Sequence, residues 1–158
     1  ADAMGGVAGH AGLFSTALDL SVFARMMLNG GIAPACLPGE EAGEPCPVAR
    51  LSDVTVLERS VQEVFTSRYD DTSSRALGWD TPSGQSSAGD YLTSQAYGHT
   101  GYTGTSLWID PELDLWVVLL TNRVHPTREN QKHVPLRRAV HDATALAITD
   151  QSIQQRQP

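Results

Sequence analysis

The most constraining feature of this chain is an apolar run over residues 115–120, where six consecutive positions carry leucine, tryptophan or valine. A strand without a polar position has no face for solvent, so the predicted strand over 115–121 must be covered on both sides. A turn at 110–114 precedes it, and a further strand is predicted over 97–109. Strands joined by so short a connection pair antiparallel. The sequence therefore predicts a buried antiparallel sheet.

A helix is predicted between Thr16 and Gly30. Thr16 and Asp19 have the spacing of a capping box, with Asp in the position usually held by Glu or Gln. Gly30 and Gly31 are expected to end the helix. Its apolar face consists of Leu18, Val22, Phe23, Met26 and Met27.

Other segments complete the predicted fold. A second helix is expected over 53–65 after an N-cap at Ser52, and a third opens at Pro135. Their apolar faces are Leu57, Val61, Val64 and Phe65 in the second helix, and Leu136, Val140, Ala143 and Ala147 in the third. Residues 76–79 are predicted as a short strand and 81–95 as a loop. Helices grouped against an antiparallel sheet define an α+β fold, expected as a single partial domain over 1–158 with a frayed tail at 151–158.

Charge and composition exclude several classes of function. The formal net charge is −7, from 11 basic and 18 acidic residues, and Lys132 is the only lysine. We see no basic cluster in the sequence, which argues against a nucleic-acid partner. No apolar run is long enough for a membrane span, and no signal peptide is recognisable. No metal or other cofactor is expected, because His133 and His141 lack zinc-ligand spacing and are predicted to be solvated.

The two cysteines, Cys36 and Cys46, lie in a loop rich in proline and glycine over 32–50. Two interpretations stay open: two free thiols, or a local disulfide formed in an oxidising compartment.

The residues best suited to chemistry lie in the segment 98–104, which reads GHTGYTG. His99 offers a hydrogen-bond donor or acceptor, Thr100 offers a hydroxyl, and the backbone N–H groups could face an oxyanion. Glycine in a strand often marks the close approach of a ligand or another backbone. By composition alone, the same segment also fits a plain glycine-rich hairpin.

The triplet His99-Thr100-Gly101 resembles the third motif, usually Lys-Thr-Gly, of the β-lactamase and penicillin-binding-protein group. The stretch 98–122, GHTGYTGTSLWIDPELDLWVVLLTN, resembles the sheet hairpin of the class C-like serine hydrolases. Residues 5–28, GGVAGHAGLFSTALDLSVFARMML, resemble the glycine turn and helix that precede this hairpin, and Leu77-Gly78-Trp79 fits the strand between them. The three blocks occur in the family's order.

This resemblance implies a β-lactamase/transpeptidase-like fold and an acyl-serine mechanism. Such enzymes combine a Ser-x-x-Lys nucleophile, a Tyr-x-Asn pair and the Lys-Thr-Gly strand. The implied site residues are His99, Thr100, Gly101 and Tyr102, whose backbone N–H would supply half of an oxyanion hole. Losing one such donor costs about 10²–10³ in rate.

The chain departs from the family's pattern at three points. It contains no Ser-x-x-Lys and no Tyr-x-Asn sequence. We therefore expect the C-terminal portion of a serine hydrolase, inactive by itself. His99 replaces a lysine that would be a permanent cation, and a histidine is mostly neutral at pH 7. This argues against tight recognition of a β-lactam carboxylate and favours an ester, amide or peptide substrate.

An alternative class of function is a non-catalytic binding or regulatory module on the same scaffold. The two hypotheses differ in behaviour, because a partial domain would expose apolar faces and a sheet edge and would tend to self-associate. Family analogy alone points to the periplasm or cell envelope. His10 is expected to be a turn residue, and Asp110 and Asp114 are expected to shape their turn.

Overall fold

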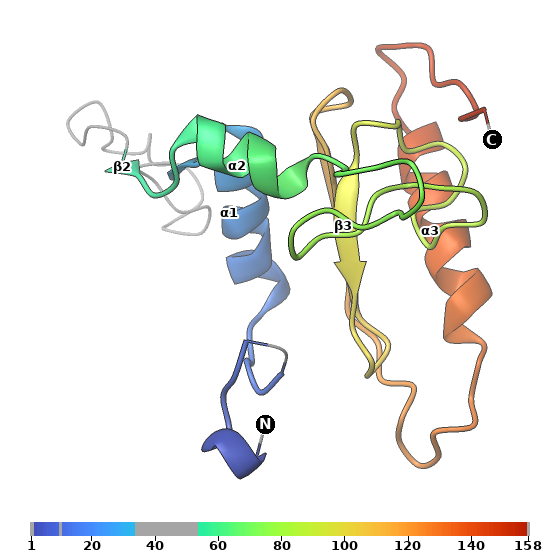
Figure 1. The fold of residues 1–158 in the computed structure, drawn as a ribbon. Helices are drawn as coiled ribbons and strands as arrows, with labels where there is room; N and C mark the ends of the chain where they lie inside the picture. Colours follow the sequence, from blue (N-terminus) through green and yellow to red (C-terminus); the bar gives the residue numbers. More distant parts are fainter. Residues whose placement is uncertain (1, 10, 34–53, 158) are drawn as a thin grey trace, which may run out of the picture.

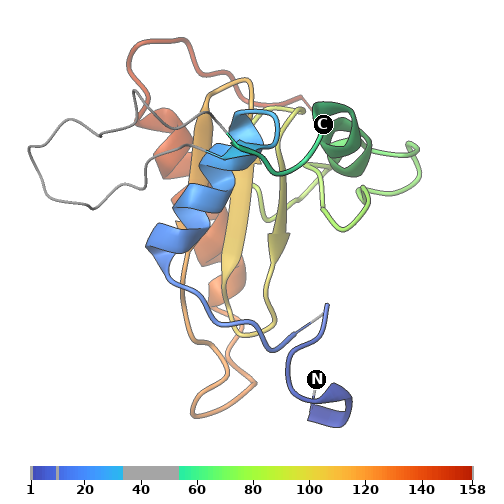
Figure 2. The same ribbon diagram turned by 90° about the vertical axis from the view of Figure 1, so that its left-hand side faces the viewer.

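The computed structural model describes residues 2–9, 11–33 and 54–157. Three strands, β3 (Tyr97–Thr100), β4 (Ser106–Asp110) and β5 (Leu115–Leu119), form an antiparallel sheet in the order β3-β4-β5. Helices α1 (Ala17–Leu28) and α3 (His133–Leu146) lie on opposite faces of this sheet (Figures 1 and 2). The predicted α+β fold with an antiparallel sheet is confirmed.

The remaining elements are short. A 3₁₀ turn, η1 (Asp2–Met4), precedes α1, and the two-residue strands β1 (Ile32–Ala33) and β2 (Val54–Thr55) pair antiparallel. Helix α2 (Arg59–Thr66) follows β2 and lies beside α1 (Figure 1). No helix among the described residues is long and apolar enough to cross a bilayer.

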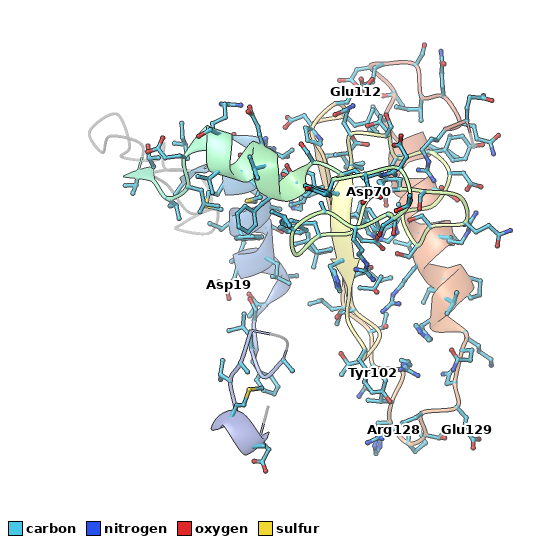
Figure 3. The ribbon with its side chains drawn as sticks, viewed as in Figure 1. Asp19, Asp70, Tyr102, Glu112, Arg128 and Glu129 are labelled. Carbon is cyan, nitrogen blue, oxygen red and sulfur yellow. The ribbon has the colours of Figure 1, made fainter. Side chains whose placement is uncertain are left out.

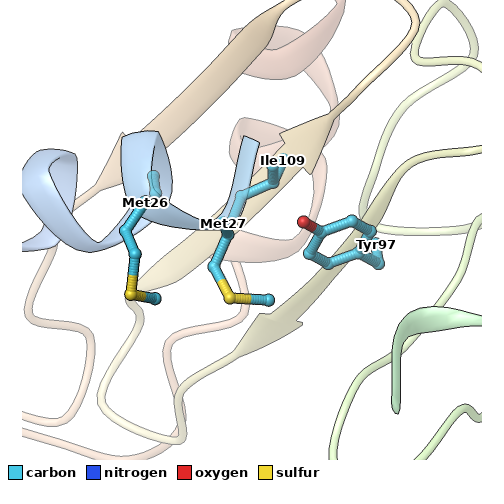
Figure 4. Packing of buried hydrophobic residues seen from close by; sticks show 5 residues of the cluster. Met26, Met27, Tyr97 and Ile109 are labelled. Carbon is cyan, nitrogen blue, oxygen red and sulfur yellow. The ribbon is translucent and has the colours of Figure 1, made fainter. Parts of the chain in front are cut away.

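The face of the sheet that carries Tyr97 packs against α1. Met26 and Met27 on the helix meet Tyr97 and Ile109 on the strands (Figure 4). Trp79 lies edge-on to the Tyr97 ring, with the ring centroids 5.1 Å apart. Each fully buried large side chain of this kind stabilises the fold by about 1.5–3 kcal/mol.

The opposite face packs against α3. Trp108 is completely buried there, in a cluster whose other buried members are Ala88, Leu92, Ala96 and Ala145. The loop over 81–95 thus contributes core residues although it contains no helix or strand. The last residues also belong to this side: Ile153 packs on the cluster, and Arg156 donates to the carbonyls of Leu92 and Gly89. These contacts hold Ile153 and Arg156, which lie within the tail at 151–158 that was expected to fray.

The ends of α1 follow the sequence prediction. The Thr16 hydroxyl oxygen accepts the Asp19 backbone N–H at 3.1 Å. At the other end, Gly30 and Gly31 have positive φ angles, and their N–H groups bond to the carbonyls of Met27 and Met26. Of the expected apolar face, however, Leu18 and Phe23 are exposed.

The predicted strand over 97–109 is in fact two strands. A turn at 101–105 separates β3 from β4, so the glycines of this segment build a hairpin. Residues 76–79 are a bend rather than a strand, closed by a β-bridge between Arg75 and Asp80 and turned by Gly78 with φ +81°. A single isolated Leu-Gly-Trp triplet cannot distinguish these two conformations.

Helix α2 begins at Arg59 rather than at residue 53, because Val54 and Thr55 are held extended by their pairing with β1. Its buried residue is Gln62, and the apolar residues Val61, Val64 and Phe65 are exposed. Ser52, Cys36, Cys46 and His10 lie outside the described residues.

Helix α3 begins at His133, and it buries a different face from the predicted apolar stripe. Arg137, His141 and Ala145 point inward, whereas Leu136 is exposed. His141 is completely buried rather than solvated, and its Nδ1 lies 2.6 Å from the Ser87 carbonyl oxygen. Helix α3 packs against carbonyl groups of a turn and a loop that need hydrogen-bond donors. Polar residues that supply these donors therefore face inward, although apolar periodicity predicted another face.

Asp110 organises the turn between β4 and β5, as expected. Its fully buried carboxylate accepts the N–H and hydroxyl of Thr93 and the N–H groups of Glu112 and Leu113. Asp114, with φ +46°, forms an ion pair with Arg25 at 2.8 Å.

Substituting Gly98→Ala is expected to destabilise the fold by about 2 kcal/mol, because overpacking a core typically costs 1–3 kcal/mol. A Cβ at Gly98 would overlap the Leu107 carbonyl oxygen and the Trp108 ring. Gly9→Ala is the matched control, since no atom of the described residues lies within 4 Å of the place that its methyl group would occupy. Urea unfolding midpoints of both variants would measure the difference, and equal midpoints would contradict the packing described.

Stability is expected to fall as the pH drops below about 6.5 through His141. Burial lowers the pKa of His141 below its ordinary value of 6.5, against the opposing effects of the Ser87 carbonyl and Asp142. As the pH falls below 6.5, the unfolded chain binds a proton at this imidazole that the folded chain does not bind. The contribution of His141 to the free energy of unfolding is therefore fully present above pH 6.5 and is lost below it. One such proton changes the free energy of unfolding by at most about 1.4 kcal/mol per pH unit.

Urea unfolding at pH 7.5 and 5.5 checks this expectation. His141→Asn should lose less stability over the interval than the unmodified protein, and His125→Gln, an exposed histidine, should behave like the unmodified protein. Some slope should persist in His141→Asn, because burial and the charges of Arg137 and Arg123 also lower the pKa of His133. An unaltered slope in His141→Asn would show that this imidazole is not the group responsible.

Candidate functional site

Strand β3 places His99 and Thr100 on opposite faces of the sheet, since successive side chains alternate in a strand. His99 pairs with Leu107 and shares the α1 face with Tyr97, whereas Thr100 pairs with Ser106 on the α3 face. Beyond β4, the outer edge of β3 is bridged only at Gly98, which exchanges backbone hydrogen bonds with Asp80 in the described part of the chain. Most of this edge therefore faces outward next to the predicted site.

His99 is exposed, and both of its ring nitrogens have partners. Nδ1 lies 2.9 Å from the Thr100 carbonyl oxygen, and Nε2 lies 2.9 Å from Nη1 of Arg75. A carbonyl only accepts and a guanidinium only donates, so Nδ1 carries the hydrogen and Nε2 accepts. This is the neutral tautomer of the imidazole.

The structure thus brings a permanent cation to the position where the sequence indicated none. Arg75 is held by its bridge to Asp80, and its Nε lies 4.0 Å from the Asp80 carboxylate. A guanidinium presents several donors, so Arg75 can bond His99 and still offer N–H groups to a ligand. Sequence reasoning missed it because Arg75 is remote in sequence, and only the bend at 76–79 brings it back to β3.

The turn at 101–105 carries the other two predicted residues. The Gly101 N–H donates to the Thr105 carbonyl at 2.8 Å, and the Gly104 N–H donates to the Gly101 carbonyl at 3.1 Å. A side chain at Gly101 would overlap the Thr105 hydroxyl. Within the described parts of the chain, the Tyr102 N–H donates to no acceptor, so it is available to a ligand.

The side chain of Tyr102 projects from the end of the hairpin, close to the loop that carries Arg128 and Glu129 (Figure 3). The Arg123 guanidinium lies over the Tyr102 ring at 4.4 Å, and its Nε donates to the Tyr102 carbonyl at 2.8 Å. Arg123 also donates to the Arg128 carbonyl at 3.0 Å. The turn is consequently supported by an arginine that the sequence did not single out.

In the described part of the chain, the hollows lined by residues of β3 include a smaller and a larger one. The smaller, of about 290 Å³, is polar and includes Thr100 and Arg137 in its lining, with hydroxyls from Ser74, Thr81 and several loop serines. The larger, of about 530 Å³, lies between the end of α1, α2 and residues 94–97, and none of the four predicted residues lines it. The smaller hollow reaches the motif itself at Thr100, whereas the larger one reaches β3 only at Tyr97, ahead of the motif.

A serine and a histidine also meet beneath this strand. The Ser106 hydroxyl lies 3.3 Å from Nε2 of His141, which resembles a nucleophile and its base. Both side chains are buried, however, with 4% and 0% of their surface exposed, so a substrate cannot reach the hydroxyl. The pair joins α3 to the sheet. Among the described residues, no group of three or more His, Cys, Asp or Glu could hold a metal ion.

Comparison with known proteins gives a consistent assignment. The Beta-lactamase family model matches residues 1–142. A "Putative D-alanyl-D-alanine carboxypeptidase" of Escherichia coli (strain K12) is 34% identical over 134 residues, covering 82% of this chain and 27% of the relative. The protein of the same description from Salmonella typhi is 35% identical over 135 residues, covering 84% and 27%.

An "N-acetylmuramyl-L-alanine amidase" of Bacillus subtilis (strain 168) is 34% identical over 125 residues, covering 77% of this chain and 24% of the relative. The chain therefore spans about a quarter of the length of the curated relatives that it matches. No solved structure gives a significant match. The family match over nine-tenths of the sequence, together with these relatives, shows that the chain belongs to the β-lactamase family of serine hydrolases.

Proposed function

We propose that this segment forms one wall of the substrate cleft in a serine hydrolase that cleaves an amide or peptide bond next to a free carboxylate. The observation that carries the proposal is the Arg75–His99 pair next to the turn at 101–105, where the Tyr102 N–H has no acceptor among the described residues. Arg75 supplies the cation for the substrate carboxylate, and His99 holds it in place. The Tyr102 N–H stabilises the oxyanion that develops when the scissile carbonyl is attacked.

The names of the relatives support this choice of bond. Both the carboxypeptidase and amidase descriptions denote cleavage of amide linkages, and a carboxypeptidase acts next to a terminal carboxylate. The difference from the family's motif at position 99 therefore does not remove the cation. A histidine and an arginine acting together take the place of the lysine.

The nucleophile of this mechanism lies outside the 158 residues. The sequence contains no Ser-x-x-Lys, and the buried Ser106 hydroxyl is inaccessible. Phe14 before α1, and Leu18 and Phe23 on α1, are exposed apolar residues against which a nucleophile-bearing segment would pack. A non-catalytic binding module is the alternative that the experiments below would reveal.

Removing the Arg75 cation is expected to weaken recognition of the substrate carboxylate selectively. In the protein that carries both this segment and the nucleophile, Arg75→Gln should lower kcat/KM about 10- to 100-fold for a peptide with a free terminal carboxylate, as expected for a charge-assisted hydrogen bond. The same peptide with a terminal carboxamide should be cleaved at a nearly unchanged rate. Steady-state kinetics on the two peptides measure the ratio.

Arg128→Gln is the matched control for this experiment, since Arg128 is exposed in the loop after β5. It should leave both rates unchanged. If Arg75→Gln slowed the two peptides by the same factor, the arginine would have a structural role and the assigned substrate class would be wrong.

The 158-residue chain alone is expected to form no covalent adduct with a fluorophosphonate or a fluorescent penicillin, as read by intact mass. The protein that includes the Ser-x-x-Lys segment should be labelled once per molecule. A stoichiometric adduct on the short chain would reveal a nucleophile within these residues, and no adduct on either protein would favour the non-catalytic module.

A further inference from the structure

The peptide bond between Gly101 and Tyr102 is held on one side by two donors. Its carbonyl oxygen accepts the Gly104 N–H at 3.1 Å and Nη2 of Arg137 at 2.7 Å. The same Nη2 donates to the Thr105 carbonyl at 2.7 Å. Arg137 thus clamps both ends of the turn from α3.

This clamp determines where the Tyr102 N–H points. The Gly101–Tyr102 peptide is trans, and in a planar trans peptide the C=O and N–H bonds point in opposite directions. Because Arg137 attaches to the carbonyl from α3, the N–H points away from α3.

We infer that Arg137 is a positioning residue for the oxyanion site: it fixes and polarises the Tyr102 N–H through the Gly101 carbonyl. The inference rests on the proposed function and adds a residue that does not touch the substrate. A charged donor on a carbonyl withdraws electron density from the amide and makes its N–H a stronger donor, since hydrogen bonds in a chain strengthen one another. Arg137 therefore acts on the transition state through one peptide group.

The surroundings of Arg137 support a role beyond packing. Only 7% of its surface is exposed, its Nε has no hydrogen-bond partner, and no carboxylate in the described part of the chain forms an ion pair with it. A buried charge without a counterion destabilises the fold, so an apolar side chain at this position would make the fold more stable. The uncompensated charge instead remains directed at the turn.

A second arginine donates a hydrogen bond to the carbonyl of the next peptide group. Arg123 donates from Nε to the Tyr102 carbonyl, whose peptide carries the Thr103 N–H. Arg123 is also close enough to Arg137 that its charge contributes to lowering the Arg137 pKa, after the larger effect of burial. Two cations that form no ion pair among the described residues thus surround the turn and favour negative charge beside it.

The test compares Arg137→Gln with Arg138→Gln in the protein that carries the nucleophile. Arg138 is the matched control, being the next residue of α3 and making two hydrogen bonds, to Ser86 and Asp90, away from the turn. Arg137→Gln should lower kcat about tenfold with little change in KM, less than the 10²–10³ lost with a complete oxyanion donor. Arg138→Gln should leave kcat and KM unchanged.

The infrared stretch of the acyl-enzyme carbonyl supplies a readout that misfolding does not mimic. A weaker oxyanion donor raises the frequency of this band, so Arg137→Gln should shift it to higher wavenumber, and Arg137→Lys, which keeps one charged donor, should shift it less. An unchanged band and kcat in Arg137→Gln, or the same shift in Arg138→Gln, would overturn the inference. If the unmodified protein formed no acyl-enzyme at all, the proposed function itself would fall.

Discussion

The pairing of β3 with β4 is the constraint on which the rest of the structure depends. Gly98 lies opposite Trp108 with no room for a side chain, so the register cannot slip without moving the largest buried residue. Because side chains alternate along a strand, this one register sends Tyr97 and His99 to α1 and Thr100 to α3. The core and the candidate site are therefore set by the same hydrogen-bonded ladder.

Helix α3 buries a polar face whose side chains donate hydrogen bonds to backbone carbonyls. Arg137 and His141 occupy inward positions that helical periodicity reserves for apolar side chains, yet each donates to a backbone carbonyl of a turn or loop. Burying a polar backbone group without a partner costs more than burying a donor that satisfies it. The helix thus stabilises the turn at 101–105 and the loop over 81–95 simultaneously.

Local signals in the sequence were sufficient for some elements. The Thr16–Asp19 cap, the paired glycines after α1 and the apolar run of β5 depend on neighbouring residues, and each was predictable. The start of α2 and the buried face of α3 depend on partners distant in the chain, so periodicity gave the wrong answer. The motif at 99–102 could be found through its resemblance to the family's Lys-Thr-Gly triplet, whereas Arg75, Arg123 and Arg137 carry no local signature and are recognisable only once the hairpin is folded.

The tautomer of His99 restricts which residues can replace it when this motif is transplanted between family members. Nε2 accepts a hydrogen bond from Arg75, so position 99 must offer a lone pair. A lysine there would place two cations within about 3 Å of each other, where they repel strongly. The bend that delivers Arg75 and the first residue of the motif are therefore a matched set, and a chimaera that transplanted Lys-Thr-Gly alone would expel the arginine from the site.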